Sequence, residues 1–373
     1  MNRKKLGFGC MRLPISDPAD HSSIDLETVK RMVDTFIDEG FTYFDTAYMY
    51  HNYTSEEAMG RALVARHKRD SYTLATKMPV ISLKDKVHQA QVFDEQMRKC
   101  QVDYFDYYLV HNLGANHYNK ALELDTFDFV RQKKKEGKVG SIGFSYHDNA
   151  ALLDKILIEQ PDMEFVQLQI NYMDWENDGI QSRKCYEVAT RHGKPVIVME
   201  PVKGGALAQV PVEAEALFKG YNPAMSVASW AIRYAASLPN VRMVLSGMSD
   251  MAQLEDNLSY MKDFQRLSEE EYEVIEKARG VIEKSIAIAC TGCAYCVEGC
   301  PKHIPIPYYF ALYNADKQSL NRIFSPQFNY YDNHIRDHAK ASDCIACGKC
   351  EKSCPQHLQI IRHLKEVAAN FEK

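Results

Sequence analysis

Eight of the eleven cysteines lie in the last quarter of the chain, where they form two runs of identical spacing. Each run is followed by a proline, and the runs are Cys290, Cys293, Cys296 and Cys300, then Cys344, Cys347, Cys350 and Cys354. In a cytosolic chain, clustered thiols indicate metal binding rather than disulfides. The chemistry of this part of the chain is therefore expected to depend on thiolate ligands.

The spacing C-x2-C-x2-C-x3-C-P is typical of bacterial ferredoxins and predicts [4Fe–4S] clusters. Three thiolates on one tight loop bind three irons of a cubane, and the fourth iron takes the last cysteine of the other run. A zinc site would instead require two pairs of ligands. We predict two clusters with crossed ligands: Cys290, Cys293, Cys296 and Cys354 for the first, and Cys344, Cys347, Cys350 and Cys300 for the second.

A second set of reactive side chains lies at the ends of successive predicted strands. Asp45 ends one strand, Tyr50 follows in the next loop, and Lys77 and His111 end the next two strands. Singly, each residue has an ordinary structural explanation, such as a helix cap or a packed aromatic ring. Together they suit acid–base chemistry on a carbonyl or an alcohol, because an ammonium stabilises a phenolate and a carboxylate holds the ammonium. His111 would hydrogen-bond the substrate oxygen or shuttle a proton.

The elements that position these residues alternate between short β-type runs and helical patterns over about 260 residues, the size of a (β/α)8 TIM barrel. A doubly wound sheet is the alternative, but no G-x-G-x-x-G follows the first strand. A capping box at Thr54 and Glu57 is expected to open one helix, and Gly40 to end another. The predicted strands are Lys5–Gly9, Tyr43–Asp45, Thr73–Thr76, Tyr107–Val110, Ser141–Phe144, Phe165–Gln169, Val196–Met199 and Val244–Ser246.

The domain organisation changes after the barrel. Ser268 and Glu271 fit a capping box that opens a helix reaching Ser285. We therefore divide the chain into a barrel over 1–265, a linking helix over 266–285 and a small C-terminal iron–sulfur, ferredoxin-type domain over 286–373.

The composition of the chain argues against some classes of binding partner. The chain has 45 Lys and Arg against 50 Asp and Glu, a net charge of −5, which argues against nucleic acid as the main partner. No uncharged stretch approaches the roughly 18–20 residues that a membrane helix needs. The basic start, Met1 to Lys5, lacks the apolar core of a signal peptide, so we expect a cytoplasmic protein.

Three segments, Asp45–Tyr50, Leu74–Lys77 and Leu109–His111, together resemble the aldo-keto reductase superfamily in sequence and in order. The resemblance covers roughly residues 1–262 and implies a (β/α)8 barrel with a catalytic tetrad of Asp45, Tyr50, Lys77 and His111. With the cysteine runs, the whole chain is similar to the bacterial branch that carries a C-terminal two-cluster ferredoxin-type domain.

The resemblance also implies positions for a nicotinamide cofactor. These positions are Gly9 beside the nicotinamide, Ser145 and Gln167 on its carboxamide, Lys203 and Gly204 on the pyrophosphate, and Asp256 and Asn257 at the adenine. The Lys and Arg that clamp the 2′-phosphate of NADP in many members correspond here to Gly247 and Gln253. Because neutral Gln cannot replace a bidentate Arg, the sequence does not choose between NADPH and NADH.

Two functions remain open from the sequence. In the first, the barrel reduces a small-molecule carbonyl or oxidises an alcohol with NAD(P)H, and the clusters serve electron transfer, sensing or structure. In the second, the chain is an iron–sulfur electron-transfer protein that takes electrons from a ferredoxin or a flavoprotein without nicotinamide. A nicotinamide transfers two electrons as a hydride, whereas an iron–sulfur cluster transfers one electron at a time. The sequence shows no flavin motif that would link the two cofactors.

Overall fold

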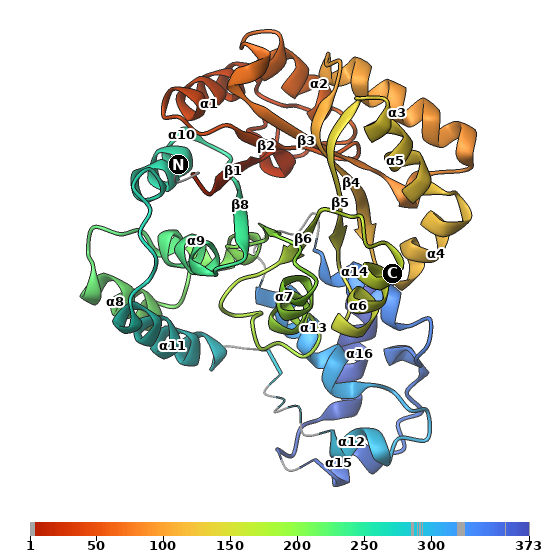
Figure 1. The fold of residues 1–373 in the computed structure, drawn as a ribbon. Coiled ribbons are helices and arrows are strands. Elements are labelled where there is room, and N and C mark those ends of the chain that lie inside the picture. The colour runs from red at the N-terminus through yellow and green to blue at the C-terminus, as the bar shows by residue number, and fades with distance from the viewer. Residues whose placement is uncertain are drawn as a thin grey trace.

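The computed structural model describes residues 4–284, 287–288, 290, 292, 294–318, 325–354 and 356–372. Eight parallel strands close into a barrel in chain order, with β8 hydrogen-bonded to β1 (Figure 1). This confirms the predicted TIM barrel and excludes the doubly wound sheet. The strands are β1 (Leu6–Gly9), β2 (Tyr43–Asp45), β3 (Thr73–Met78), β4 (Phe105–Leu113), β5 (Val139–Tyr146), β6 (Phe165–Gln169), β7 (Val196–Met199) and β8 (Val241–Gly247).

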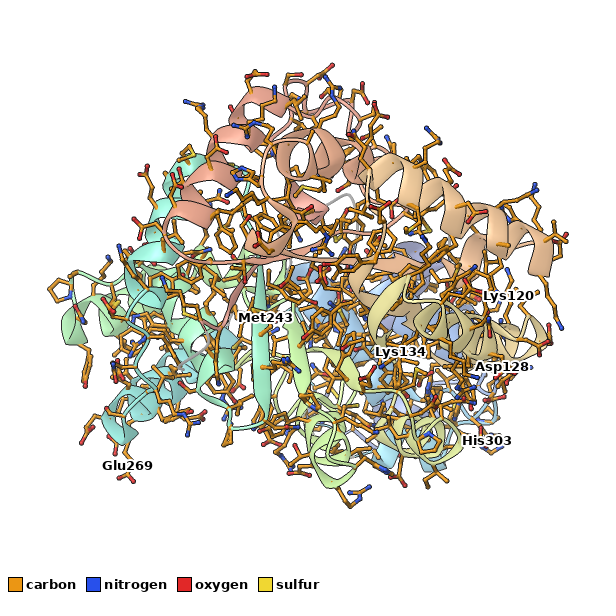
Figure 2. All side chains as sticks on the ribbon, turned by 45° about the horizontal axis from the view of Figure 1, so that its top comes forward. Lys120, Asp128, Lys134, Met243, Glu269 and His303 are labelled. Carbon is orange, nitrogen blue, oxygen red and sulfur yellow. The ribbon has the colours of Figure 1, made fainter. Side chains whose placement is uncertain are left out.

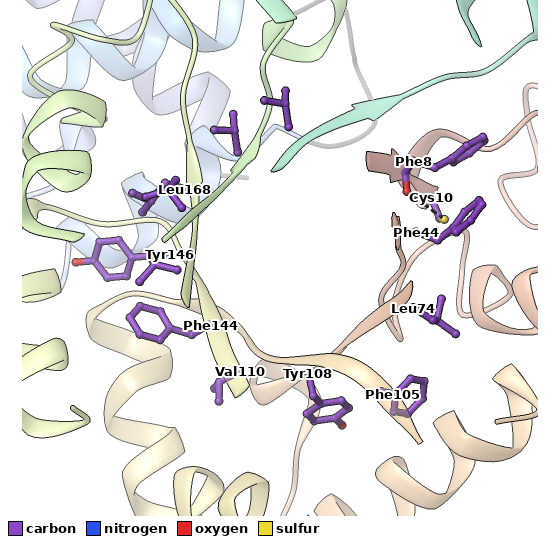
Figure 3. Packing of buried hydrophobic residues seen from close by; sticks show 14 of the residues in the cluster. Phe8, Cys10, Phe44, Leu74, Phe105, Tyr108, Val110, Phe144, Tyr146 and Leu168 are labelled. Atoms are coloured by element: carbon purple, nitrogen blue, oxygen red, sulfur yellow. Dashed lines mark hydrogen bonds between the residues drawn. The ribbon is translucent and has the colours of Figure 1, made fainter. Parts of the chain in front are cut away.

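Helices cover the outside of the barrel (Figure 1). The side chains between the strands and these helices, among them Phe8, Phe44 and Tyr108, point away from the barrel interior (Figure 3). Charged side chains such as Asp128 and Glu269 lie at the periphery (Figure 2). The helices are α1 (Leu26–Asp38), α2 (Ser55–Met59), α3 (Lys86–Cys100), α4 (Ala115–Glu123), α5 (Thr126–Lys135), α6 (Ala150–Glu159), α7 (Ser182–Arg191), α8 (Val212–Tyr221), α9 (Val227–Ser237), α10 (Met251–Met261) and α11 (Glu269–Glu283).

The inside of the barrel is closed by an apolar layer. Successive residues of a strand face opposite sides of the sheet, so one strand serves both the inner layer and the outer core. The members of the inner layer, each from a different strand, are Tyr43, Ala75, Leu109, Phe165, Ile197 and Leu245. The positions two residues further along each strand face the same interior at its C-terminal end, where barrels carry their active sites.

The C-terminal part forms a small helical unit beside the C-terminal ends of the strands (Figure 1). Its core joins aromatic and aliphatic side chains to several cysteines, and Ile180 of the barrel packs into the same cluster. Across the described residues, no helix combines the length and the apolar character that crossing a membrane would require. The helices of this unit are α12 (Tyr295–Glu298), α13 (Ile306–Gln318), α14 (Gln327–His334), α15 (Lys349–Lys352) and α16 (Ile360–Phe371).

The two predicted capping boxes have different outcomes. Ser268 accepts a hydrogen bond from the backbone N–H of Glu271, whose carboxylate accepts one from the N–H of Ser268, so this box is present at the start of α11. The box predicted at Thr54 and Glu57 is wrong. The Thr54 hydroxyl instead donates to the carbonyl of His51 at 2.6 Å. Gly40, with φ of +76°, follows the end of α1 as predicted.

Candidate active site and iron–sulfur centres

Three of the four predicted catalytic residues are in direct contact. Lys77 on β3 donates hydrogen bonds to Asp45 on β2 at 2.5 Å, to the Thr46 carbonyl at 2.7 Å and to the Tyr50 hydroxyl at 3.3 Å. Asp45 and Lys77 lie two residues beyond members of the inner apolar layer, so strand alternation places both inside the barrel. Gln167 on β6 donates to the second Asp45 oxygen at 3.1 Å.

Burial governs the charge states of this group. It lowers the pKa of Lys77, but the attraction of Asp45 and Tyr50 outweighs it, so the pKa of Lys77 is raised and the ammonium stays charged. Burial also raises the pKa of Tyr50, against the opposing effect of Lys77. The phenol is therefore protonated at neutral pH and suited to donate a proton.

His111, the fourth predicted residue, lies on β4 across from Tyr50. The two ring centroids are 6.1 Å apart and nearly perpendicular. Burial and the charge of Lys77 hold the pKa of His111 well below its usual value, so the imidazole is neutral at physiological pH. A neutral imidazole suits a hydrogen bond to a substrate oxygen better than proton transfer. Both residues line a cavity of about 310 Å³ at the barrel mouth.

The buried carboxyl group of Glu56 is linked to Lys77 through hydrogen bonds of Gln96. Glu56 on α2 accepts hydrogen bonds from Thr76 at 2.6 Å and from Gln96 at 2.7 Å, and Gln96 also donates to the Lys77 carbonyl at 3.0 Å. Burial, only partly offset by these hydrogen bonds, raises the pKa of Glu56 to about 7. Sequence reasoning did not single out Glu56, because its position in a charged helix start looks solvent-exposed.

A second cleft of about 450 Å³ lies beside the first cavity and contains part of the predicted dinucleotide site. Gly204, Asp256 and Asn257 line it. Asn257 donates to the Ser246 hydroxyl at 2.7 Å, and Asp256 accepts from Ser226 at 2.7 Å. Gly204 has a left-handed φ of +66°, which favours glycine and lets the backbone approach a ligand.

The remaining predicted cofactor positions lie elsewhere. Ser145 and Gln167 line the cavity that contains Tyr50. Gly9 lies inside the sheet between β2 and β8. The ammonium of Lys203 is buried in an ion pair with Asp174 and is absent from the described lining of the cleft.

Arg12 is a cation of the cleft that the sequence analysis missed. It is the one Lys or Arg among the described residues that line this cleft, and its guanidinium lies 3.6 Å from the Glu200 carboxylate. A side chain at Gly247 would press against Arg12, with a Cβ only 3.0 Å from the Arg12 Cδ. The sequence could have indicated Arg12, because it lies three residues after the end of the first strand, at the end of the barrel where active sites lie. Glu200 lines both the cleft and the cavity and so marks their junction.

The cysteines of the second unit gather around two small hollows. Cys290, Cys296 and Cys354 line one, and Cys300, Cys344, Cys347 and Cys350 line the other. Each hollow thus combines cysteines of both runs, in the predicted crossed grouping. Cys293 lies outside the described residues. Cysteines of two loops around one hollow are the ligand set of a crossed iron–sulfur cluster, although no three His, Cys, Asp or Glu side chains among the described residues are placed to hold a single metal ion.

The fold is a (β/α)8 barrel with a cavity and an adjoining cleft that contain the predicted site residues. A sequence model of the aldo/keto reductase family matches residues 5–279, and a model of the 4Fe-4S dicluster domain matches residues 289–359. The chain therefore belongs to the aldo/keto reductase family and carries an iron–sulfur domain at its C-terminal end.

The chain is also similar to other oxidoreductases, and the solved structures among them share its barrel fold. The uncharacterized oxidoreductase YqkF of Bacillus subtilis (strain 168) is 21% identical over 73% of this chain and 91% of its own. L-galactose dehydrogenase of Arabidopsis thaliana is 23% identical over 65% of this chain and 81% of its own. The holo form of aldo-keto reductase AKR11C1 from Bacillus halodurans superposes with a TM-score of 0.60, at 22% identity, over 74% of this chain and 91% of that one. An aldo/keto reductase from Klebsiella pneumoniae, in complex with NADP and acetate, gives 0.58 at 20% identity over 74% and 95%.

Proposed function

We propose that the barrel reduces a small-molecule carbonyl compound, or oxidises the corresponding alcohol, with a nicotinamide dinucleotide. The observation that carries the proposal is the buried contact of Lys77 with Asp45 and Tyr50 beneath a cavity that adjoins a second, glycine-lined cleft. Such an arrangement has an acid poised at one site and room for an extended cofactor at the next.

Bound NAD(P)H would supply a hydride to the carbonyl carbon and leave as NAD(P)⁺. The residues of the chain then have distinct roles. His111 donates a hydrogen bond to the carbonyl oxygen and fixes its direction. Tyr50 gives its proton to that oxygen, which completes the alcohol, and the resulting phenolate is stabilised by the ammonium of Lys77. Asp45 keeps that ammonium charged and in place, and solvent returns the proton to Tyr50.

The cofactor fits the chemistry of the cleft lining. The backbone N–H of Gly204, whose φ is positive, suits an anionic pyrophosphate, whereas the N–H of Gly205 donates to the Val202 carbonyl at 3.0 Å. Arg12 supplies a positive charge there in addition to the Gly204 amide. We assign Ser145 and Gln167 to the nicotinamide carboxamide and Asp256 and Asn257 to the adenine end.

For the C-terminal unit, we propose two [4Fe–4S] clusters with the crossed ligands predicted above, in a domain that begins at about residue 286. Clusters of this kind exchange single electrons. A ferredoxin or flavoprotein partner would supply or take those electrons. The two cysteine-lined hollows also favour the second candidate, an electron-transfer protein that works without nicotinamide.

The deciding experiment replaces Tyr50 by Phe in the cluster-replete protein. We expect turnover of carbonyl compounds with NADPH or NADH to fall by about 10²–10⁴-fold, the usual contribution of a positioned general acid. Nucleotide affinity, measured by tryptophan fluorescence quenching, and the visible absorbance of the clusters should remain as in the wild type. Unchanged turnover, or no binding of either nucleotide to the wild type, would leave the electron-transfer candidate in its place.

A further inference from the structure

The cavity above the tetrad is not built by the barrel alone. Two residues of the C-terminal unit, Pro326 and Asn329, line it together with Tyr50 and His111. Pro326 is the N-cap of α14, and Asn329 lies in its first turn. The helix that contributes them belongs to the segment between the two cysteine runs. A barrel without this unit would therefore have an incomplete cavity wall.

Specific contacts hold α14 against the loops after β4 and β5. Asn333 donates to the His147 carbonyl at 3.1 Å and accepts from the Asn116 N–H at 3.4 Å. The edge of the Tyr330 ring meets the His147 ring, with centroids 5.6 Å apart. A Cβ at Gly114 would lie 2.1 Å from the Asn333 amide nitrogen, so this close approach requires glycine. Residues of α14 and residues of the barrel therefore together fix the position of the helix.

Three polar side chains at this junction have an unsatisfied atom. They are Asn112 Oδ1, His147 Nδ1 and Asn329 Nδ2, which are buried without a hydrogen-bond partner among the described residues, and all three residues line the cavity. His147 is only 7% exposed. A buried polar group without a partner destabilises the protein, so such groups gather where a ligand completes them.

We propose that α14 completes a polar substrate subsite, and that the substrate is a small carbonyl compound bearing hydroxyl groups beside its carbonyl. This inference rests on the proposed reductase function. Hydroxyl groups both donate and accept, so they can satisfy an amide nitrogen, an amide oxygen and an imidazole nitrogen in one place. The cavity of about 310 Å³ suits a compound of a few carbons. Met11, Met49 and Ile81 also line the cavity and would cover the carbon chain.

The experiment compares matched ligands with and without hydroxyl groups on the cluster-replete, full-length protein. The substrates are erythrose and butanal, and the non-reacting probes are the corresponding alcohols, erythritol and 1-butanol, added in the presence of the reduced nucleotide, which cannot transfer a hydride to them. The variant is Asn329→Leu, which keeps the size of the side chain and removes its amide. Asp332→Ala, an exposed position on the same helix, is the matched control.

We expect Asn329→Leu to lower kcat/KM for erythrose about tenfold and to weaken erythritol binding by a similar factor, since a hydrogen-bonding partner of the substrate is lost. Butanal turnover, nucleotide affinity and cluster absorbance should stay within about twofold of the wild type, and Asp332→Ala should match the wild type throughout. Equal losses for erythrose and butanal, or no loss for either, would overturn the subsite.

The binding arm separates this inference from the proposed function. If the wild type reduces no carbonyl compound but binds erythritol more tightly than 1-butanol, and Asn329→Leu removes the difference, the reductase proposal fails while the polar subsite stands. If the wild type reduces butanal as well as erythrose and shows no preference for erythritol, the subsite fails while the reductase stands.

Discussion

Replacing Lys77 by Met should cost both activity and stability, for reasons that can be separated. The substitution removes the ammonium that contacts Asp45 at 2.5 Å and Tyr50 at 3.3 Å. The Asp45 carboxylate then stays buried and, among the described residues, keeps only the Gln167 amide at 3.1 Å as a partner. An uncompensated buried charge destabilises a protein by about 3–5 kcal/mol. Turnover should fall by at least about 10²-fold, because nothing then stabilises the phenolate form of Tyr50.

A second substitution distinguishes the two losses. Asp45→Asn in the Lys77→Met background removes the unpaired charge, so most of the lost stability should return while the activity does not. The free energy of unfolding can be followed in urea by tryptophan fluorescence, since both tryptophans, Trp175 and Trp230, lie in the barrel. Cluster absorbance serves as the control for the second unit. A Lys77→Met protein as stable as the wild type, or an active double variant, would refute the role given to this buried pair.

Two further predictions use other parts of the molecule. Glu56, whose pKa is raised to about 7 in the folded protein, holds a proton that the unfolded chain releases, so native stability should fall as the pH rises from about 4.5 to 7. The free energy of unfolding of Glu56→Gln should not fall in this way, and it should exceed that of the wild type by about 3 kcal/mol at pH 8 but not at pH 4. An equal difference between the two proteins at both pH values would contradict this prediction. If the cluster ligands are crossed, Cys296 and Cys354 bind the same cluster, so adding Cys354→Ser to Cys296→Ser should remove no further iron. Adding Cys300→Ser to Cys296→Ser should instead remove most of the remaining iron, because Cys300 binds the other cluster. Iron analysis with low-temperature EPR measures both losses, and the reverse order would contradict the crossed ligands.

The barrel could be predicted from the sequence because its signals are local. Short apolar runs identified all eight strands, and β2, β6 and β7 have the predicted bounds. β4 is longer than its apolar centre, since the polar residues His111 and Asn112 continue it into the site. Because Asp45, Lys77 and His111 end successive parallel strands, the sequence alone placed them at the same end of the barrel.

Two of the missed features depend on partners distant in sequence, and one depends on local backbone geometry. The glycine-rich loop at Lys203 predicted a cation for phosphate, yet Asp174, from the loop after β6, takes that ammonium into a buried ion pair. The N-cap geometry expected at Thr54 fails because the preceding residues His51 to Tyr53 have positive φ and place a carbonyl within reach of the hydroxyl. The contact of Arg12 with Glu200 brings together the segments that follow β1 and β7, which are far apart in the sequence.

The docking of α14 bears on why one chain contains both units. Asn333 and Asn116 come from segments more than 200 residues apart, and their contact closes the barrel cavity with a helix held between the two cysteine runs. The proposed clusters would fix those runs and, with them, the span of chain that contains α14. Loss of a cluster would then alter the substrate cavity without any electron passing between the two units. A structural coupling of this kind needs no flavin, and it would reconcile the proposed two-electron reaction in the barrel with the proposed one-electron centres next to it.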